Sequence, residues 1–122
     1  RPRVLVVDDI VTNRMALGQI LTRLNCDVSY AQDGEEMVRN VATEEPFDLV
    51  LTDVQMPIMN GIEATKQVRT LEDPEKSSTV VVSISASAMD VQESASVMDD
   101  HLAKPVGKEA LAKLLRRLQD GE

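Results

Sequence analysis

Aromatic side chains are scarce in this chain of 122 residues, in which Tyr30 and Phe47 are the only two. A core must therefore be built from Val, Leu, Ile, Ala and Met, and the hydrophobic share of 43% is normal for a globular protein. Cysteine is scarcer still, because Cys26 stands alone and no internal disulfide can form. A single thiol suits a reducing compartment.

Positive charge is also in short supply, with 13 Lys and Arg against 21 Asp and Glu and a net charge of −8. A surface of that sign repels phosphate backbones, so we expect no direct nucleic-acid binding. No apolar run approaches the ~20 residues that span a bilayer, and no signal-peptide pattern opens the chain. We expect a cytoplasmic domain without membrane contact, although a parent chain could be membrane-anchored.

The length fits one domain over residues 1–122, with no linker, repeat or low-complexity segment. The first core strand begins almost at once, at Arg3 or Val4, and no initiator Met precedes it. We therefore expect the chain to be processed or cut from a longer polypeptide.

Three short apolar runs predict the centre of a parallel sheet. They cover residues 4–7, 47–53 and 80–85, and continuous β-branched runs of this length indicate strands that are buried on both faces. The segment 27–31 alternates between apolar and polar residues, and the segment 101–103 is very short. Those two are better interpreted as edge strands.

Helical patterns lie between the strands. The clearest follows the last strand, where leucines recur at the i, i+3, i+4 and i+7 positions of one helical face from Leu111 to Leu118. Asp33 followed by Glu36 resembles a capping box. The segment 73–78 is predicted to be a polar loop.

Five strands that alternate with five helices predict an α/β fold, a flavodoxin-like (βα)5 doubly wound parallel sheet. If the second and fifth strands are the edges, the strand order is 2-1-3-4-5, which reverses direction between strands one and three. Sites in such folds lie at the carboxyl ends of the strands, at that reversal. Asp8, Asp9 and Asp53 end strands one and three and should meet there.

Three neighbouring carboxylates repel one another, so a cation is needed if all three are ionised. Oxygen ligands of this kind suit Mg²⁺, which typically takes one or two carboxylates and keeps several waters. The alternative is that a raised pKa leaves one of the three carboxyls neutral.

Two further side chains should reach the same edge of the sheet. Lys104 follows the fifth predicted strand and Ser85 ends the fourth, while Ser83 and Ser87 flank it. A point charge and a hydroxyl near a carboxylate suit a phosphoryl group. Asp53 could then act as the nucleophile on phosphorus, with charge neutralisation and positioning as the main catalytic effects.

At this point four segments, taken together and in this order, closely resemble the receiver domain of two-component response regulators. The resemblance covers nearly the whole chain and rests on VLVVDD (4–9), LTDVQMPIMNG (51–61), SISAS (83–87) and HLAKP (101–105).

The resemblance implies that Asp53 is the phosphoacceptor. It also implies that Asp9, Asp53 and the main-chain carbonyl of Gln55 ligate Mg²⁺ or Mn²⁺, with Asp8 acting mainly through a metal-bound water. Lys104 would contact the phosphoryl group, so that the domain forms an aspartyl phosphate during signal transduction.

Two residues are implied as switch residues, Ser85 through its hydroxyl and His101 by its position. Receivers usually place Tyr or Phe where His101 stands, and a smaller, polar ring puts a buried aromatic switch in doubt. His101 could instead tune a response to pH, or be a partly exposed edge residue without a special role.

The resemblance names the partners too. The donor would be the phosphohistidine of a histidine kinase or of a histidine phosphotransfer domain, as in a phosphorelay. The output would be a changed partner surface on the fourth helix, fifth strand and fifth helix, which allows a phosphorylation-dependent dimer. The segment VQMPIMNG (54–61) and the pair Asn13-Arg14 resemble receivers inside hybrid histidine kinases. The parent chain could therefore be an enzyme, although this domain would be only a phosphoacceptor.

Two other functions stay open. A receiver-like binding module that is never phosphorylated would have the same fold, but degenerate receivers usually lose an acid or the lysine. A Mg²⁺-dependent phosphohydrolase of the haloacid-dehalogenase type needs a second acid two residues after the nucleophile, where this chain has Gln55.

Overall fold

The computed structural model describes residues 1–120, apart from the side chain of Ala88, so residues 121–122 of the predicted domain lie outside the described residues. The strands are β1 (Arg3–Val7), β2 (Asp27–Ala31), β3 (Leu49–Asp53), β4 (Val81–Ser85) and β5 (Asp100–Ala103). The helices are α1 (Val11–Arg23), α2 (Gly34–Thr43), α3 (Gly61–Arg69), α4 (Pro74–Ser77), α5 (Ala88–Ser94) and α6 (Lys108–Gln119).

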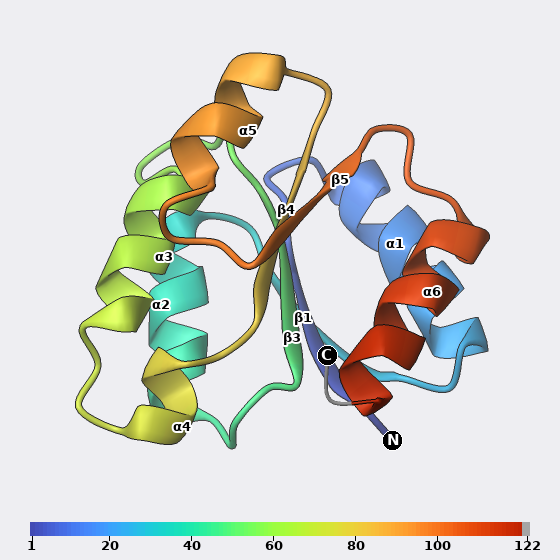
Figure 1. Ribbon diagram of the computed structural model, residues 1–122, viewed down its shortest axis with the longest axis horizontal. Coiled ribbons are helices and arrows are strands. Elements are labelled where there is room, and N and C mark those ends of the chain that lie inside the picture. The colour runs from blue at the N-terminus through green and yellow to red at the C-terminus, as the bar shows by residue number, and fades with distance from the viewer. Residues whose placement is uncertain (121–122) are drawn as a thin grey trace.

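All five strands form one parallel sheet in the order β2-β1-β3-β4-β5, so the predicted fold class and strand order are confirmed. The strands that read as continuous apolar runs, β1, β3 and β4, occupy the centre, where both faces are covered. The alternating segment and the very short one form the two edges, as their patterns predict. Figure 1 shows the sheet between two layers of helices.

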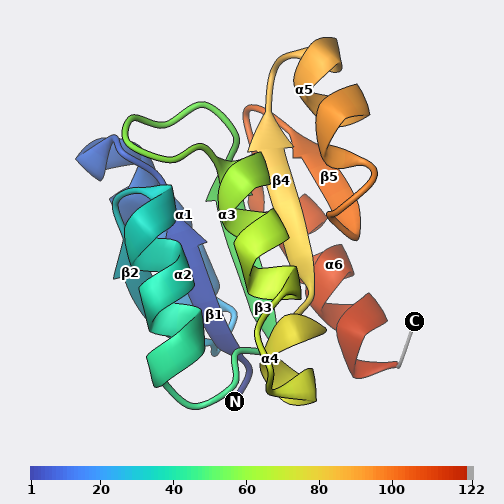
Figure 2. The same cartoon turned by 90° about the vertical axis from the view of Figure 1, so that its left-hand side faces the viewer.

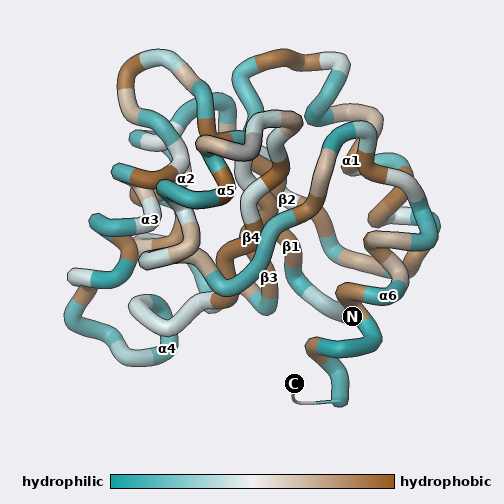
Figure 3. Tube along the Cα trace, turned by 45° about the horizontal axis from the view of Figure 1, so that its top comes forward, coloured by the Kyte–Doolittle hydropathy of each residue, from teal (hydrophilic) through white to brown (hydrophobic). Residues whose placement is uncertain are grey.

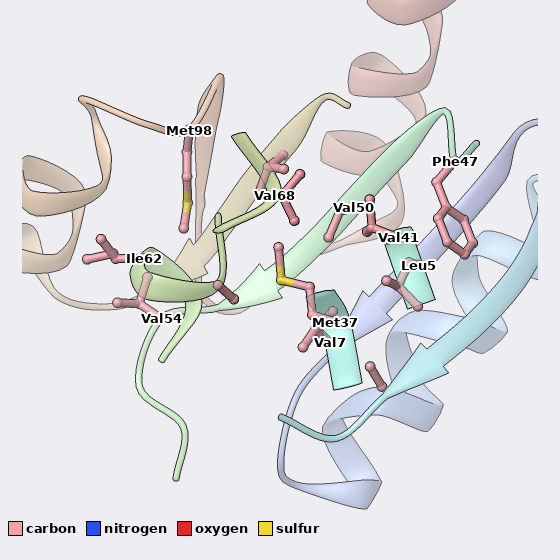
Figure 4. Packing of buried hydrophobic residues seen from close by; sticks show 13 residues of the cluster. Leu5, Val7, Met37, Val41, Phe47, Val50, Val54, Ile62, Val68 and Met98 are labelled. Carbon is pink, nitrogen blue, oxygen red and sulfur yellow. The ribbon is translucent and has the colours of Figure 1, made fainter. Parts of the chain in front are cut away.

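The alternation of side chains along each strand divides the core into two clusters. Leu5, Val7 and Val50 pack with α2 and α3 on one face, the cluster that Figure 4 shows. Val4 and Val6 pack with α1 and α6 on the other. Figure 2 shows the first of these helical layers in front of the sheet, and Figure 3 shows hydrophobic residues gathered along the central strands.

Local sequence signals fix where several helices begin. The Asp33 side chain accepts a hydrogen bond from the backbone N–H of Glu36 at 2.9 Å, so the predicted cap of α2 is confirmed. The reciprocal contact of a capping box is absent from the described hydrogen bonds, because the Glu36 carboxylate binds Gln32 instead. Asn60 caps α3 in the same way as Asp33 caps α2.

The prediction of a polar loop over 73–78 was wrong for its central part. Pro74–Ser77 forms the short helix α4, because Asp73 accepts a hydrogen bond from the N–H of Glu75 and Pro74 has the backbone angle that suits a first helical position. The described residues therefore contain six helices, and the fourth and fifth predicted helices are α5 and α6.

The structure also bears on the single cysteine and on the scarcity of long apolar segments. Cys26 is buried in the cluster beneath α1 and α6, and burial raises the pKa of its thiol. Within residues 1–120, no helix has the length and apolar character that crossing a bilayer requires.

Candidate functional site

The strand register brings distant acidic residues to one edge of the sheet. Val7 lies beside Thr52, and Asp53 lies beside Ile84, so the chain leaves β1 at Asp8 directly next to the end of β3. Figure 2 shows these two strands side by side, at the point where the order of the strands along the chain reverses. This is the crevice that open α/β sheets offer to ligands.

Three carboxylates converge in this crevice. One oxygen from each of Asp8, Asp9 and Asp53 lies within 4.8 Å of the others. Asp8 is 2% exposed and Asp53 8% exposed, whereas Asp9 faces solvent. The donor set is all oxygen and carries three formal negative charges, so the residues fit a hard divalent cation such as Mg²⁺.

The local electrostatics show the cost of this arrangement at Asp8. Burial raises the pKa of the Asp8 carboxyl, and the negative charges of Asp53 and Asp9 raise it further. The backbone N–H of Ile10, which donates to Asp8 at 2.9 Å, and the positive charge of Lys104 act in the opposite direction without cancelling the rise. A cation in the crevice would therefore relieve a repulsion that the fold imposes.

Lys104 is the cation that the fold itself supplies. Its Nζ lies 3.3 Å from Asp53 Oδ2. Leu102 packs in the cluster beneath α1 and α6, and Lys104, two residues later, belongs to the same face of the sheet by alternation. Asp8 and Asp53 belong to that face as well. A pocket of about 370 Å³ opens on this face, and Asp8, Lys104 and Ile84 are among its lining residues.

The backbone around Asp53 is tightly packed. The N–H of Gly61 donates to the carbonyl of Val54, and a Cβ on Gly61 would lie 2.3 Å from the carbonyl oxygen of Asp53. Only glycine allows this approach. The Thr52 hydroxyl donates to the same Asp53 carbonyl at 2.8 Å. The start of α3 therefore holds the Asp53 main chain in place.

Ser85 lies on the other side of the sheet. Alternation along β4 puts Ser83 and Ser85 on the face of Val81, opposite to Asp53. Among the described hydrogen bonds, none joins Ser85 to Asp53; its hydroxyl donates to Asp90 at 2.7 Å. The structure thus brings Asp8, Asp9, Asp53 and Lys104 together and leaves Ser85 turned toward α5.

Gln55 and His101 also make contacts that the sequence did not foretell. The Gln55 side-chain amide donates to the second oxygen of Asp90 at 3.0 Å. The His101 ring nitrogen Nδ1 lies 2.9 Å from the hydroxyl of Ser83, at half-buried depth. His101 is therefore neither fully inserted nor fully exposed.

Two residues near the site were missed. Asp90 is buried in the first turn of α5, and its position three residues after Ser87 marks it as an ordinary first-turn helix residue, which hides its contact with Ser85. Arg14, noticed only as part of a subfamily pattern, donates to the Asp8 main-chain carbonyl at 2.8 Å. Its position six residues after Asp8, on the first turn of α1, could have predicted this contact with the end of β1.

Comparisons with known proteins point to one family. The family model described as the response regulator receiver domain matches residues 4–116. Sensor protein GacS of Pseudomonas syringae pv. syringae is 38% identical over 118 residues, which cover 93% of this chain but only 13% of GacS. The chain therefore spans about an eighth of that relative's length.

Two solved structures share the fold and part of the sequence. The receiver domain of sensor histidine kinase PA1611 from Pseudomonas aeruginosa PAO1, with a magnesium ion in its active-site cleft, is 28% identical with a TM-score of 0.83, covering 98% of this chain and 95% of that one. The Saccharomyces cerevisiae co-crystal of the phosphotransfer protein Ypd1 with the Ssk1 receiver domain gives 32% identity and a TM-score of 0.84, with coverage of 97% and 88%.

Proposed function

This chain belongs to the response regulator receiver domain family of two-component signalling, and from that premise we propose that it is a phosphoryl-accepting switch in which Asp53 is the acceptor. One observation carries the proposal: Asp53 is a buried carboxylate that belongs to the acidic cluster and also forms an ion pair with Lys104. We propose one receiver domain over residues 1–122.

The transfer step needs little covalent chemistry from the protein. The donor is the phosphohistidine of a histidine kinase or a histidine phosphotransfer domain. Its N–P bond breaks, the electron pair returns to the imidazole nitrogen, and an O–P bond forms at a carboxylate oxygen of Asp53. Lys104, already 3.3 Å from Asp53, contacts the incoming phosphoryl oxygens and offsets their charge.

The residues that would hold Mg²⁺ or Mn²⁺ are Asp9, Asp53 and the main-chain carbonyl of Gln55, with Asp8 acting through a bound water. When bound, the cation neutralises charge on the phosphoryl oxygens and on the carboxylates. The support is the convergence of three carboxylates and the raised pKa of Asp8. The Ile10 N–H meanwhile keeps the Asp8 carboxylate oriented.

Exposed apolar side chains around the crevice support docking of a protein donor. Ile10, Val11 and Met15 are about half exposed at the start of α1, next to Asp9, and Ile58 is 76% exposed on the loop after Asp53. Patches of this kind on a charged surface mark sites of protein contact. The partner that fits is a phosphohistidine-bearing domain with an apolar rim around its histidine.

The output surface is formed by α5, β5 and α6. Ser85, at the end of β4, and His101, on β5, are the switch residues that link it to Asp53, and a changed surface there would alter partner binding or dimerisation. The helix α5 is short and rests mainly on β4, which suits an element with two arrangements. The domain acts within a longer signalling chain, such as a hybrid histidine kinase, as a phosphoacceptor and not as a turnover enzyme.

The test is a mass measurement on the purified chain after incubation with acetyl phosphate, with and without Mg²⁺. We expect a gain of one phosphoryl group that depends on Mg²⁺, disappears in Asp53→Asn and persists in Asp27→Asn, which changes an exposed aspartate in the same way. No gain from acetyl phosphate or from a phosphohistidine donor would contradict the switch and favour a binding module that is never phosphorylated.

A further inference from the structure

Asp90 is a buried carboxylate with no assigned task. It lies in the first turn of α5 and is 6% exposed. Its two oxygens accept hydrogen bonds from two different segments: Oδ2 from the Ser85 hydroxyl at 2.7 Å, and Oδ1 from the Gln55 side-chain amide at 3.0 Å. Neither donor is a cation, so this carboxylate is kept buried by hydrogen bonds to neutral groups.

These two hydrogen bonds form a bridge, which we call the Asp90 bridge, made of Gln55, Asp90 and Ser85. Gln55 stands two residues after Asp53 on the loop that leaves β3, and Ser85 ends β4. The bridge therefore ties the loop of the phosphoacceptor to the strand end that carries the switch hydroxyl, through the helix α5.

The one proton of the Ser85 hydroxyl is engaged in this arrangement. A serine hydroxyl has one proton to donate, and Ser85 gives that proton to Asp90. Its oxygen also accepts the backbone N–H of Ser87 at 3.0 Å, which fixes the hydroxyl on the side of α5. A phosphoryl group on Asp53 would need the same proton, so Asp90 and the phosphoryl oxygens compete for it.

We propose that Asp90 is a positioning residue that withholds the Ser85 hydroxyl from the phosphoryl group on Asp53 and thereby stabilises the unphosphorylated arrangement of the domain. This inference rests on the proposed function, because it assumes a phosphoryl group at Asp53. Engagement of the switch then requires the bond between Ser85 and Asp90 to break. Removal of the Asp90 carboxylate releases Ser85 in advance, and the phosphorylated arrangement forms more readily.

The experiment uses beryllofluoride, which binds a carboxylate oxygen in place of a phosphoryl group. Its apparent dissociation constant in the presence of Mg²⁺ is measured by calorimetry and from the amide NMR signals of Ser85 and Ser87. Asp90→Ala should bind beryllofluoride about tenfold more tightly than the wild-type chain, the ratio that one hydrogen bond to a charged group supplies. The matched control is Glu93→Ala, which removes an exposed carboxylate from the same helix and should leave the constant unchanged.

A double-mutant cycle separates competition for the proton from simple charge repulsion. In a Ser85→Ala background there is no hydroxyl to release, so Asp90→Ala should add nothing to the affinity. Asp90→Asn keeps the shape and an acceptor oxygen without the charge, and it should fall between the wild-type chain and Asp90→Ala. It also gives a readout if the alanine variant does not fold.

Three results would overturn the inference. Equal or weaker binding by both Asp90 variants, with normal binding by the wild-type chain, would remove the role of Asp90 and leave the switch function standing. An equal gain in the Ser85→Ala background would assign the effect to charge repulsion alone. Failure of the wild-type chain to bind beryllofluoride at all would refute the phosphoacceptor site together with the role of Asp90.

Discussion

Asp8→Asn should make the protein more stable when no Mg²⁺ is present. The substitution removes a buried negative charge from the acidic cluster and keeps an oxygen that accepts the N–H of Ile10. Two carboxylates 4.8 Å apart, the largest separation between the ligand oxygens of this cluster, repel each other by roughly 3.5 kcal/mol at an effective dielectric constant of about 20. Lys104 and solvent offset part of that repulsion, so we expect a net gain of about 1–2 kcal/mol in the free energy of unfolding.

The sign of the pH dependence follows from the raised pKa of Asp8. Because the folded state binds the Asp8 proton more tightly than the unfolded state, ionised Asp8 opposes folding at pH values above its folded pKa. The advantage of Asp8→Asn should therefore be complete at pH values well above that raised pKa. It should shrink as the pH falls through the raised pKa, and it should vanish below the ordinary value of 3.8, where Asp8 is protonated in both states.

The assay is urea unfolding followed by circular dichroism, at several pH values and with and without Mg²⁺. Mg²⁺ at ten times its dissociation constant should stabilise the wild-type chain by about 1.4 kcal/mol and the variant by less, because the variant has lost one charge that attracts the cation. Asp27→Asn is the control, since Asp27 is exposed. A variant no more stable than the wild-type chain at neutral pH, or an equal gain in Asp27→Asn, would refute the reasoning about crowded carboxylates.

Two further predictions concern the backbone near the site. Ile58 is a β-branched residue at φ 69°, in the centre of a turn closed by the N–H of Met59 and the carbonyl of Pro57. Ile58→Gly should therefore relieve backbone strain and raise the free energy of unfolding by about 1 kcal/mol. A loss of stability in urea would contradict this reasoning. Gly61→Ala forces a Cβ against the Asp53 carbonyl and should cost about 1–3 kcal/mol. Gly107→Ala meets nothing within 4 Å and should cost less than about 1 kcal/mol, because its only penalty is an alanine at the N-cap of α6. Equal effects of the two alanine substitutions would show that the close approach at Gly61 is unimportant.

Much of the fold was predictable because the signals were local and strong. Continuous apolar runs predicted the three central strands, and the Asp33 cap lay where its side chain predicted it. The helix α4 was missed because its four residues are all at least partly exposed and form no apolar face. An Asp-Pro pair can begin a helix or a loop, and only the following backbone decides between the two.

The candidate site was predictable where topology alone decides which residues meet. Strand order and register bring Asp8, Asp9, Asp53 and Lys104 to one edge, and both follow from the pattern of apolar runs. The direction of the Ser85 hydroxyl was not predictable, because it depends on the packing of α5 and on a bond to Asp90. The contact of His101 with Ser83 was not predicted either, because it depends on the side-chain conformations of two residues that face each other in β4 and β5.

The most direct test of the central claim is to locate the phosphoryl group after labelling with acetyl phosphate and Mg²⁺. Borohydride reduces an aspartyl phosphate to homoserine, so digestion and mass spectrometry then identify the labelled residue. The structure leads us to expect homoserine at position 53 and at no other acidic position. Homoserine at Asp8 or Asp9, or a phosphoryl group on His101 with residue 53 unchanged, would contradict the assignment of Asp53 as the acceptor.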